Sequence, residues 1–239
     1  MMSDGLGSEA EVRAAVCEGG RVLYALGLAR FLGHVSARLG TTGNIVIKPR
    51  HSREIRGMIG LRSEDMVIVD SEGQLIQGEH EPPGEVYIHT EVYRARPDVK
   101  AVVHTHQRSS VLLGVLGLPA YPVIHSHVMH VGDVGMWECP LLVSKPERGA
   151  NLASALGLRG LCHMRGHGIV AVGESVEVAV VRAALLEELA DATLRILQTG
   201  REPWVIGEEW LAELRSGERG VAGRWAYYKE LVAVAQTQA

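Results

Sequence analysis

The sequence predicts a single α/β domain whose sheet is largely antiparallel or mixed. Two observations lead to this fold class. Short apolar runs typical of strands alternate with amphipathic helical stretches, and turn signals recur about every 8 to 15 residues. No internal repeat, low-complexity tract or linker divides the 239 residues. We therefore expect one domain over residues 1–239, with its core at about 10–200 and a C-terminal tail at 201–239.

Four stretches carry apolar side chains at helical spacing and end at turn residues. These predicted helices cover residues 8–32, 85–94, 109–116 and 174–197. We expect a local break in the first helix at Gly19-Gly20, because glycine disfavours a helix interior. The fourth helix has the clearest apolar face, and Thr199-Gly200 follows its end.

The predicted strands are short apolar runs beside turn signals. They cover residues 45–47, 66–70, 74–76, 99–104, 141–143 and 168–172. We expect the second and third to form a hairpin, because Ser71-Glu72-Gly73 lies between them.

Composition excludes several classes of protein. A net charge of −4 with dispersed Arg and Lys gives no footprint for nucleic acid or an anionic membrane. The apolar runs are far shorter than the roughly 20 residues of a membrane span, and the N-terminus lacks a signal pattern. The three cysteines are odd in number and widely spaced, which favours reduced thiols. We therefore expect a cytoplasmic protein with a small-molecule substrate.

The most informative motif is His104-Thr105-His106, which ends the apolar run 99–103. Residues i and i+2 of a strand project from the same face, so both imidazoles can reach one point at the strand end. Two neutral imidazoles that converge are half of a typical divalent-metal site. Eleven histidines in the chain are about twice ordinary usage, and His-x-His alone is also common on surfaces and in cores.

Five motifs appear in a recognisable order. They are Gly33-His34-Val35-Ser36-Ala37-Arg38, Ile47-Lys48-Pro49, Glu85–His89, Tyr93–His106 and His167–Gly173. Together they resemble the class II aldolase/adducin family over roughly residues 10–200. The resemblance implies an α/β/α fold on a central, mainly antiparallel sheet. It also implies a homotetramer with active sites between subunits.

The same resemblance implies the site residues. His104, His106 and His167 match the family's metal ligands, and Glu85 matches a carboxylate that either ligates the metal or transfers protons. The family implies a divalent ion, with zinc expected first and manganese, iron or cobalt as alternatives. Adducin-like relatives that keep the fold without catalysis lose these ligands, whereas this chain retains them.

The chain departs from the sugar-phosphate aldolases where those enzymes hold phosphate with hydroxyl, amide and backbone groups. His34, Lys48, Arg50 and His51 stand at these positions. Cations of this kind suit substrate carboxylates, although they could also grip phosphate or form a solvated basic loop. Ser36, in the motif of His34, is also expected to contact substrate.

Residues 123–130 form a second departure. Ser126 replaces a tyrosine that the aldolases use as a proton donor, and His125 and His127 flank it. These histidines are candidates for general acids or substrate hydrogen bonds, with simple packing as the alternative. Near the C-terminus, Tyr227 belongs to an aromatic cluster at 224–228 that is typical of an interface or pocket wall.

With these departures, the chain resembles the aromatic-acid decarboxylases of the family, which are of the 3,4-dihydroxyphthalate type. The function expected is a metal-dependent carbon–carbon lyase that decarboxylates a hydroxylated aromatic acid. One alternative is a class II aldolase or dehydratase acting on a small hydroxy-carbonyl or sugar-phosphate substrate. A non-catalytic assembly protein and an iron oxygenase using the same histidines are further alternatives.

Overall fold

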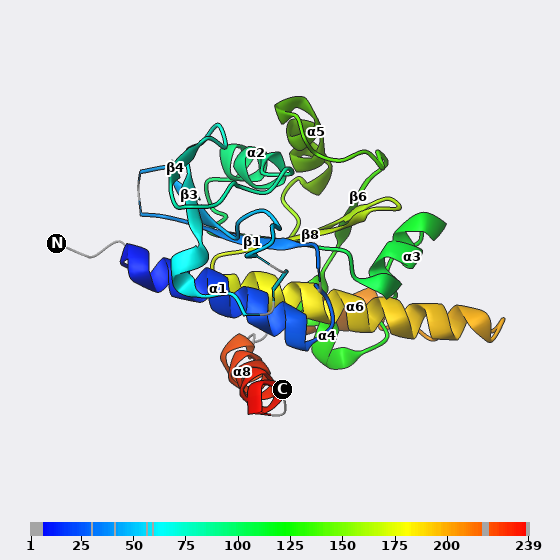
Figure 1. Cartoon of the computed structure of the whole chain (residues 1–239). Coiled ribbons are helices and arrows are strands. Elements are labelled where there is room, and N and C mark those ends of the chain that lie inside the picture. The colour runs from blue at the N-terminus through cyan, green and yellow to red at the C-terminus, as the bar shows by residue number, and fades with distance from the viewer. Residues whose placement is uncertain are drawn as a thin grey trace.

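One sheet divides the described part of the chain into two helical layers (Figure 1). The computed structural model describes residues 7–29, 31–40, 42–55, 57–58, 60–216 and 220–237. The strands found there are β1 (His34–Arg38), β2 (Ile45–Ile47), β3 (Val67–Val69), β4 (Leu75–Gln77), β5 (Ala101–Thr105), β6 (Val134–Trp137), β7 (Leu161–Met164) and β8 (Gly168–Gly173). They lie in the order β4-β3-β2-β1-β5-β8-β7-β6, and each neighbouring pair is antiparallel except β6 and β7. The predicted α/β fold with a mainly antiparallel sheet is confirmed.

Helices cover both faces of the sheet. On one face lie α1 (Glu9–Ala25) and α6 (Val176–Gln198), and on the other lie α2 (Tyr87–Ala95) and α5 (Pro146–Leu156) (Figure 1). We call these the α1–α6 face and the α2–α5 face. The remaining helical elements are the 3₁₀ turn η1 (Ser63–Asp65), α3 (Arg108–Leu116), α4 (His125–Val131), α7 (Glu208–Ser216) and α8 (Val221–Thr237).

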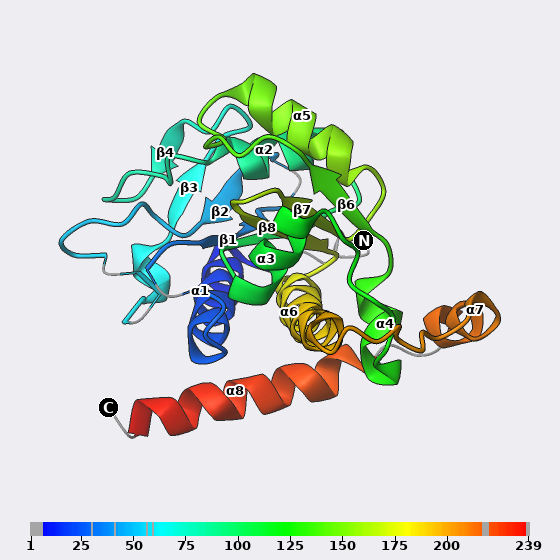
Figure 2. The same cartoon turned by 90° about the vertical axis from the view of Figure 1, so that its right-hand side faces the viewer.

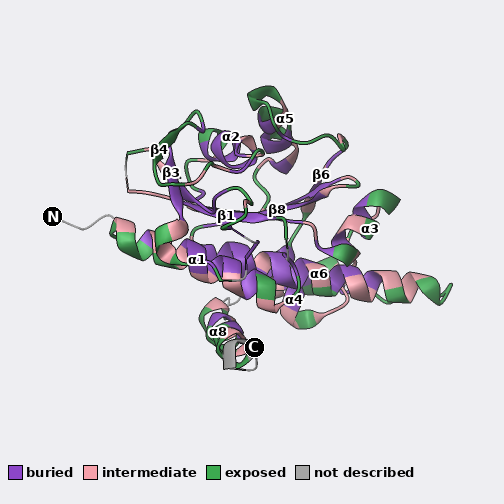
Figure 3. Cartoon of the chain, in the orientation of Figure 1, coloured by how far each residue is buried: buried purple, intermediate pink, exposed green. Residues whose placement is uncertain are grey.

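Strand alternation assigns each side chain to one of the two faces. Val35 and Val103 pack in the core under α1 and α6, whereas Val102 packs in the core under α2 and α5. Figure 3 shows that the buried residues lie on the sheet and on the helix surfaces turned toward it. Because neighbouring residues of a strand point to opposite faces, His34 and His104 face the α2–α5 layer.

The first helix differs from the sequence prediction in length and continuity. It ends at Ala25 rather than at residue 32, and it continues without a break through Gly19 and Gly20. The reason is packing: a Cβ atom on Gly19 would come within 2.6 Å of the Val176 side chain. Glycine is therefore present to let α1 approach α6, and this contact outweighs its poor helix propensity.

Two strand predictions also need correction. Residues 141–143 are not a strand but part of the loop before α5. Strands β1, β6 and β7 were not predicted, because polar residues such as His34, Ser36 and Arg38 interrupt the apolar pattern of β1. Their backbones are held by pairing with neighbouring strands, which a single run of sequence does not reveal.

The C-terminal helix α8 packs against α1 and α6, on the side of these helices away from the sheet (Figure 2). Trp225 and Tyr228 are buried there in the core of the α1–α6 face, whereas Tyr227 is 57% exposed. Among the described helices, none combines the length and the apolar character needed to cross a membrane.

Candidate metal centre

Four side chains from separate parts of the chain meet above the end of β5. His104 lies near the end of this strand and His106 just after it. His167 lies in the turn between β7 and β8, and Glu85 lies two residues before the start of α2. One ligand atom from each lies within 4.8 Å of the other three. The pairing of β5 with β8 explains the meeting, since Thr105 is opposite Ile169 and the turn before β8 therefore lies beside the end of β5.

A close approach of two backbones makes this geometry possible. A Cβ atom at Gly168 would lie 2.4 Å from the carbonyl oxygen of Thr105 and 2.9 Å from the His106 ring. Any other residue at position 168 would push the turn, and His167 with it, away from β5.

The orientation of His104 leaves one nitrogen free for a ligand. Its Nδ1 lies 2.9 Å from the carbonyl oxygen of Ile169, so this nitrogen carries the proton and donates it. Its Nε2 is 2.9 Å from Nε2 of His106, a separation that suits two nitrogens bound to one ion. Burial lowers the pKa of both rings, and this keeps them neutral with lone pairs available.

Glu85 adds a negative charge to the three imidazoles. The backbone N–H of Val143 donates to its Oε1 at 2.8 Å, while Oε2 lies 3.5 Å from Nε2 of His167 and 3.8 Å from Nε2 of His104. Burial acts to raise the pKa of Glu85, but hydrogen bonds from His167 and from the backbone N–H of Val143, together with the electrostatic influence of the neighbouring histidines, outweigh it and lower the pKa to about 2. Three imidazoles and one carboxylate form a donor set that fits a divalent cation.

Two of the residues expected to bind substrate lie next to this cluster. The ring of His34 is 5.0 Å from that of His104, and Lys48 is close enough to affect the pKa of His34. Lys48 is 4% exposed, and its ammonium donates to the carbonyl oxygen of Pro49 at 3.0 Å. Burial lowers the pKa of Lys48 to about 8. A buried amine beside this candidate metal site is suited to hold an anionic group.

Three other predicted substrate contacts lie elsewhere in the single chain. Arg50 is exposed, and the ring of His51 packs on Phe31 at 4.0 Å rather than on the histidine cluster. Tyr227 is exposed on α8, beyond α1 and α6 (Figure 2). The role of Tyr227 in substrate binding therefore stays a prediction.

Ser36 needs a different interpretation. It is fully buried, and its hydroxyl bonds to His89 and Tyr93 instead of facing the pocket. This geometry corrects the expected direct contact with substrate to a supporting role behind His34.

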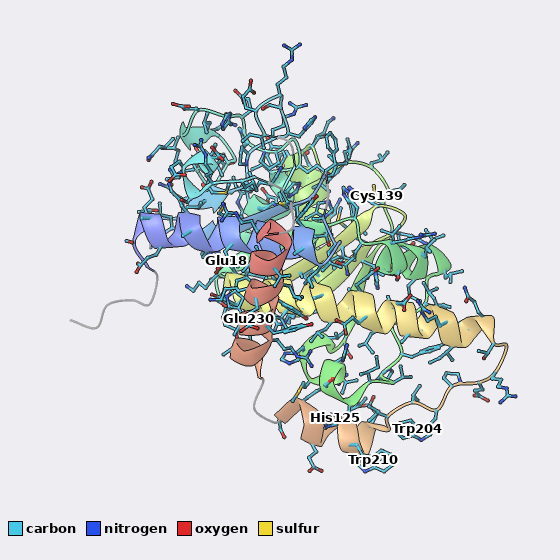
Figure 4. All side chains as sticks on the ribbon, turned by 60° about the horizontal axis from the view of Figure 1, so that its bottom comes forward. Glu18, His125, Cys139, Trp204, Trp210 and Glu230 are labelled. Carbon is cyan, nitrogen blue, oxygen red and sulfur yellow. The ribbon has the colours of Figure 1, made fainter. Side chains whose placement is uncertain are left out.

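His125 and His127 do not join the metal cluster within one chain. Both lie on α4, which packs against α6 and α7 on the opposite side of the sheet. His125 is exposed and borders a groove of about 360 Å³ beside Trp204 and Trp210 (Figure 4). His127 is buried, and its nitrogens lie 2.5 Å from the Glu188 carboxylate and 3.0 Å from the Ser126 hydroxyl. Their predicted catalytic roles therefore need a second subunit.

Sequence reasoning missed the contribution of His89 and Tyr93. His89 follows Glu85 by four residues, one helical turn, so the spacing was available as a signal. The structure shows His89 completely buried between His34 and Ser36, and Tyr93 one turn further along α2.

The sequence matches the Class II Aldolase and Adducin N-terminal domain over residues 14–194. The chain belongs to this family. It is 32% identical over 219 residues to a 3,4-dihydroxyphthalate decarboxylase from Arthrobacter keyseri, covering 87% of each chain. It is 31% identical to a 5-methylthioribulose-1-phosphate/5-deoxyribulose-1-phosphate aldolase from Rhodospirillum rubrum, covering 84% of this chain and 87% of the other.

Solved structures of this family share the fold. An aldolase II superfamily protein from Pseudomonas syringae superposes with a TM-score of 0.82 at 21% identity, covering 97% of this chain and 96% of the other. Enzymes of the family depend on a divalent metal ion, and the cluster of Glu85 with three histidines is a site that could bind one.

Proposed function

We propose that the protein is a metal-dependent carbon–carbon lyase that decarboxylates a hydroxylated aromatic acid of the dihydroxyphthalate type. The observation that carries this proposal is the convergence of His104, His106, His167 and Glu85 beside the buried Lys48. The similarity to 3,4-dihydroxyphthalate decarboxylases, which extends over most of both chains, supports the choice of substrate.

The three histidines and Glu85 are the groups that would hold the ion. A divalent cation bound there would withdraw electron density from the oxygens of the substrate. The Ile169 carbonyl fixes His104 with Nε2 toward the other imidazoles, and the backbone N–H of Val143 fixes one oxygen of Glu85. The second oxygen of Glu85 remains available either as a ligand or as a carrier of the proton that replaces the lost carboxylate.

Lys48 and His34 would bind the carboxylates of the substrate. Lys48 is buried and near enough to His34 to act on its pKa, and the backbone N–H of Lys48 donates to the Val35 carbonyl, which fixes the backbone at this position. A charge-assisted contact from a buried ammonium is stronger than the same contact in water. In the sugar-phosphate aldolases, hydroxyl and amide side chains bind the phosphate of the substrate. Here Lys48 and His34 stand at these positions, which favours a substrate with a ring carboxylate over a sugar phosphate.

A second candidate function is aldol cleavage or dehydration of a hydroxy-carbonyl compound or sugar phosphate. The observation that favours it is the 31% identity to the ribulose-phosphate aldolase of Rhodospirillum rubrum. The same metal site could stabilise an enolate, and Lys48 could bind a phosphate oxygen.

We further propose a cytoplasmic homotetramer with active sites between subunits. Large apolar side chains such as Leu112, Val115 and Leu116 on α3 are about half exposed, as expected for a surface that a second subunit covers. Such an assembly would allow His125, His127 or Tyr227 to complete a neighbour's site. Free thiols at Cys17, Cys139 and Cys162 suit a reducing compartment.

Metal analysis of the purified protein, combined with substrate assays, tests the function. Carbon dioxide release is measured with dihydroxy-aromatic mono- and dicarboxylates, and carbonyl products are measured with sugar phosphates. We expect stoichiometric divalent metal and carbon dioxide from an aromatic diacid. Cleavage of sugar phosphates without any release of carbon dioxide would favour the second function instead. Light scattering measures the oligomeric state, and a monomer would contradict the proposed assembly.

A further inference from the structure

A continuous chain of hydrogen bonds runs from the interior of the protein to the metal pocket. The Tyr93 hydroxyl lies 2.8 Å from the Ser36 hydroxyl, Ser36 lies 2.6 Å from Nδ1 of His89, and Nε2 of His89 lies 2.7 Å from Nδ1 of His34. These four side chains are all at least nine-tenths buried. A buried network of this kind has few ways to place its protons.

Tyr93 determines which group donates and which accepts in each hydrogen bond of this network. Burial raises the pKa of this phenol, which therefore keeps its proton. Among the described residues, the Ser36 oxygen is the acceptor available to the Tyr93 hydrogen. The opposite direction would leave a buried hydroxyl hydrogen without an acceptor, which is costly.

Each later bond follows from the first. Since Tyr93 donates to Ser36, the Ser36 hydroxyl hydrogen is directed to Nδ1 of His89. Burial lowers the pKa of His89 to about 3, so its ring is neutral and carries one proton, on Nε2. Nε2 of His89 then donates to Nδ1 of His34, and the proton of the neutral His34 ring is on Nε2.

Nε2 of His34 has no hydrogen-bond partner within the described part of the chain, and the ring packs 5.0 Å from His104. Lys48, His104 and His106 are all near enough to His34 to act on its pKa. A donor left without a partner here requires an acceptor from whatever occupies the pocket.

We propose that Tyr93, Ser36 and His89 are positioning residues that hold His34 in the Nε2–H tautomer, so that it donates a hydrogen bond to an anionic oxygen of the substrate beside the metal. This inference rests on the proposed function only for the identity of the substrate. The fixed donor selects carboxylate or phenolate oxygen at this place and disfavours a hydroxyl or amine that must itself donate there.

The tautomers can be measured directly. In zinc-loaded protein labelled with ¹⁵N-histidine, long-range ¹H–¹⁵N spectra distinguish protonated from unprotonated ring nitrogens, and His34→Gln and His89→Gln assign the signals. We expect protons on Nε2 of both His34 and His89. A proton on Nδ1 of either ring would overturn the inference, whatever reaction the enzyme catalyses.

Variants of Ser36 test the link between the chain and substrate binding. Ser36→Ala should give a mixture of His89 tautomers and raise KM by about tenfold, the effect of weakening one hydrogen bond to a charged group, with a smaller change in kcat. Ser36→Thr retains the hydroxyl and should restore both the tautomer and KM. An Ala variant with wild-type tautomers and KM would contradict the role of the chain.

Variants of His34 separate this inference from the substrate assignment. His34→Gln places an amide N–H near the position of Nε2 and should retain most of the substrate affinity, whereas His34→Leu should raise KM about ten- to a hundredfold. Equal effects of both substitutions would overturn the donor role. If another anionic substrate replaces the aromatic diacid, the same pattern is expected with that substrate, so a failure of the proposed function is recognisable.

Discussion

Histidines on the two faces of the sheet have contrasting surroundings. On the α2–α5 face, His104 bonds to a carbonyl through Nδ1, and its Nε2 faces the other imidazoles. On the α1–α6 side, His127 has both nitrogens in contact with neighbouring side chains of its own subunit. A buried histidine is therefore suited to bind an ion where the protein holds one ring nitrogen and leaves the other open, as at His104 and not at His127.

The largest expected effect concerns the three predicted metal ligands, His104, His106 and His167. Replacement of His104, His106 or His167 by Ala should abolish metal retention and reduce activity about a thousandfold or more, because the ion is expected to stabilise the transition state by several kcal/mol. Metal content and kcat/KM are the measurements. His127→Ala is the matched control and should keep stoichiometric metal. Full metal and activity in any of the three ligand variants would contradict the assignment.

The second prediction separates metal binding from proton transfer. Glu85→Gln keeps the size of the side chain and should retain most of the metal, since three imidazoles remain. Its kcat should fall at least about a hundredfold, the usual size of acid–base catalysis. An unchanged kcat would indicate that His125 or His127 of a neighbouring subunit, and not Glu85, transfers the proton.

The third prediction concerns Lys48, the buried cation near His34 and the predicted metal ligands. Lys48→Ala should lower kcat/KM for an aromatic diacid about ten- to a hundredfold, because a contact to a charged group contributes about 1.5–3 kcal/mol. A ring with one carboxylate should be affected much less. Arg50→Ala should have the smaller effect in this pair, since Arg50 is exposed in the single chain. Larger losses with Arg50→Ala would show that the loop closes over the substrate.

The pH dependence provides an independent check on Lys48. Burial lowers the pKa of its ammonium to about 8, so the charge is present below this pH and is lost as the pH rises through it. Because kcat/KM reports the ionisation of the free enzyme, it should fall above about pH 8 in the wild type. Lys48→Arg keeps its charge at higher pH and should shift this fall upward. A profile identical in both proteins would exclude Lys48 as the titrating group.

The sequence predicted well that Glu85, His104, His106 and His167 gather at one place, because the main signals for this are local. The spacing of His104 and His106 places both at one strand end, and the family motifs supplied Glu85 and His167. The positions of His125 and His127 could not be predicted. Which face of the sheet a helix covers depends on how α4 packs against α6, and this packing is not a property of residues 123–130 themselves.

The fold shows the same limit. Apolar runs predicted the central strands, but the alternating polar residues of β1 concealed it, although they include His34 and Ser36. The continuous α1 depends on a contact of Gly19 with Val176, about 160 residues away along the chain. Local patterns therefore identified the elements with strong periodicity, whereas long-range contacts decided the rest.

The smallest expected effect concerns His127, the histidine whose nitrogens are already in contact. The His127 hydrogen bond lowers the pKa of Glu188, a carboxylate whose side chain is 54% exposed. A carboxyl group with a lowered pKa stabilises the fold above its unfolded pKa, and this contribution disappears as the pH falls through the folded value. Because solvent screens the pair, His127→Ala should reduce the free energy of unfolding at pH 7 by only about 1 kcal/mol. The difference from wild type should shrink at acid pH, as measured by urea denaturation. If the variant instead lost metal or kcat without losing stability, His127 would act in a neighbour's active site, and the contrast between the two faces would hold only within one subunit.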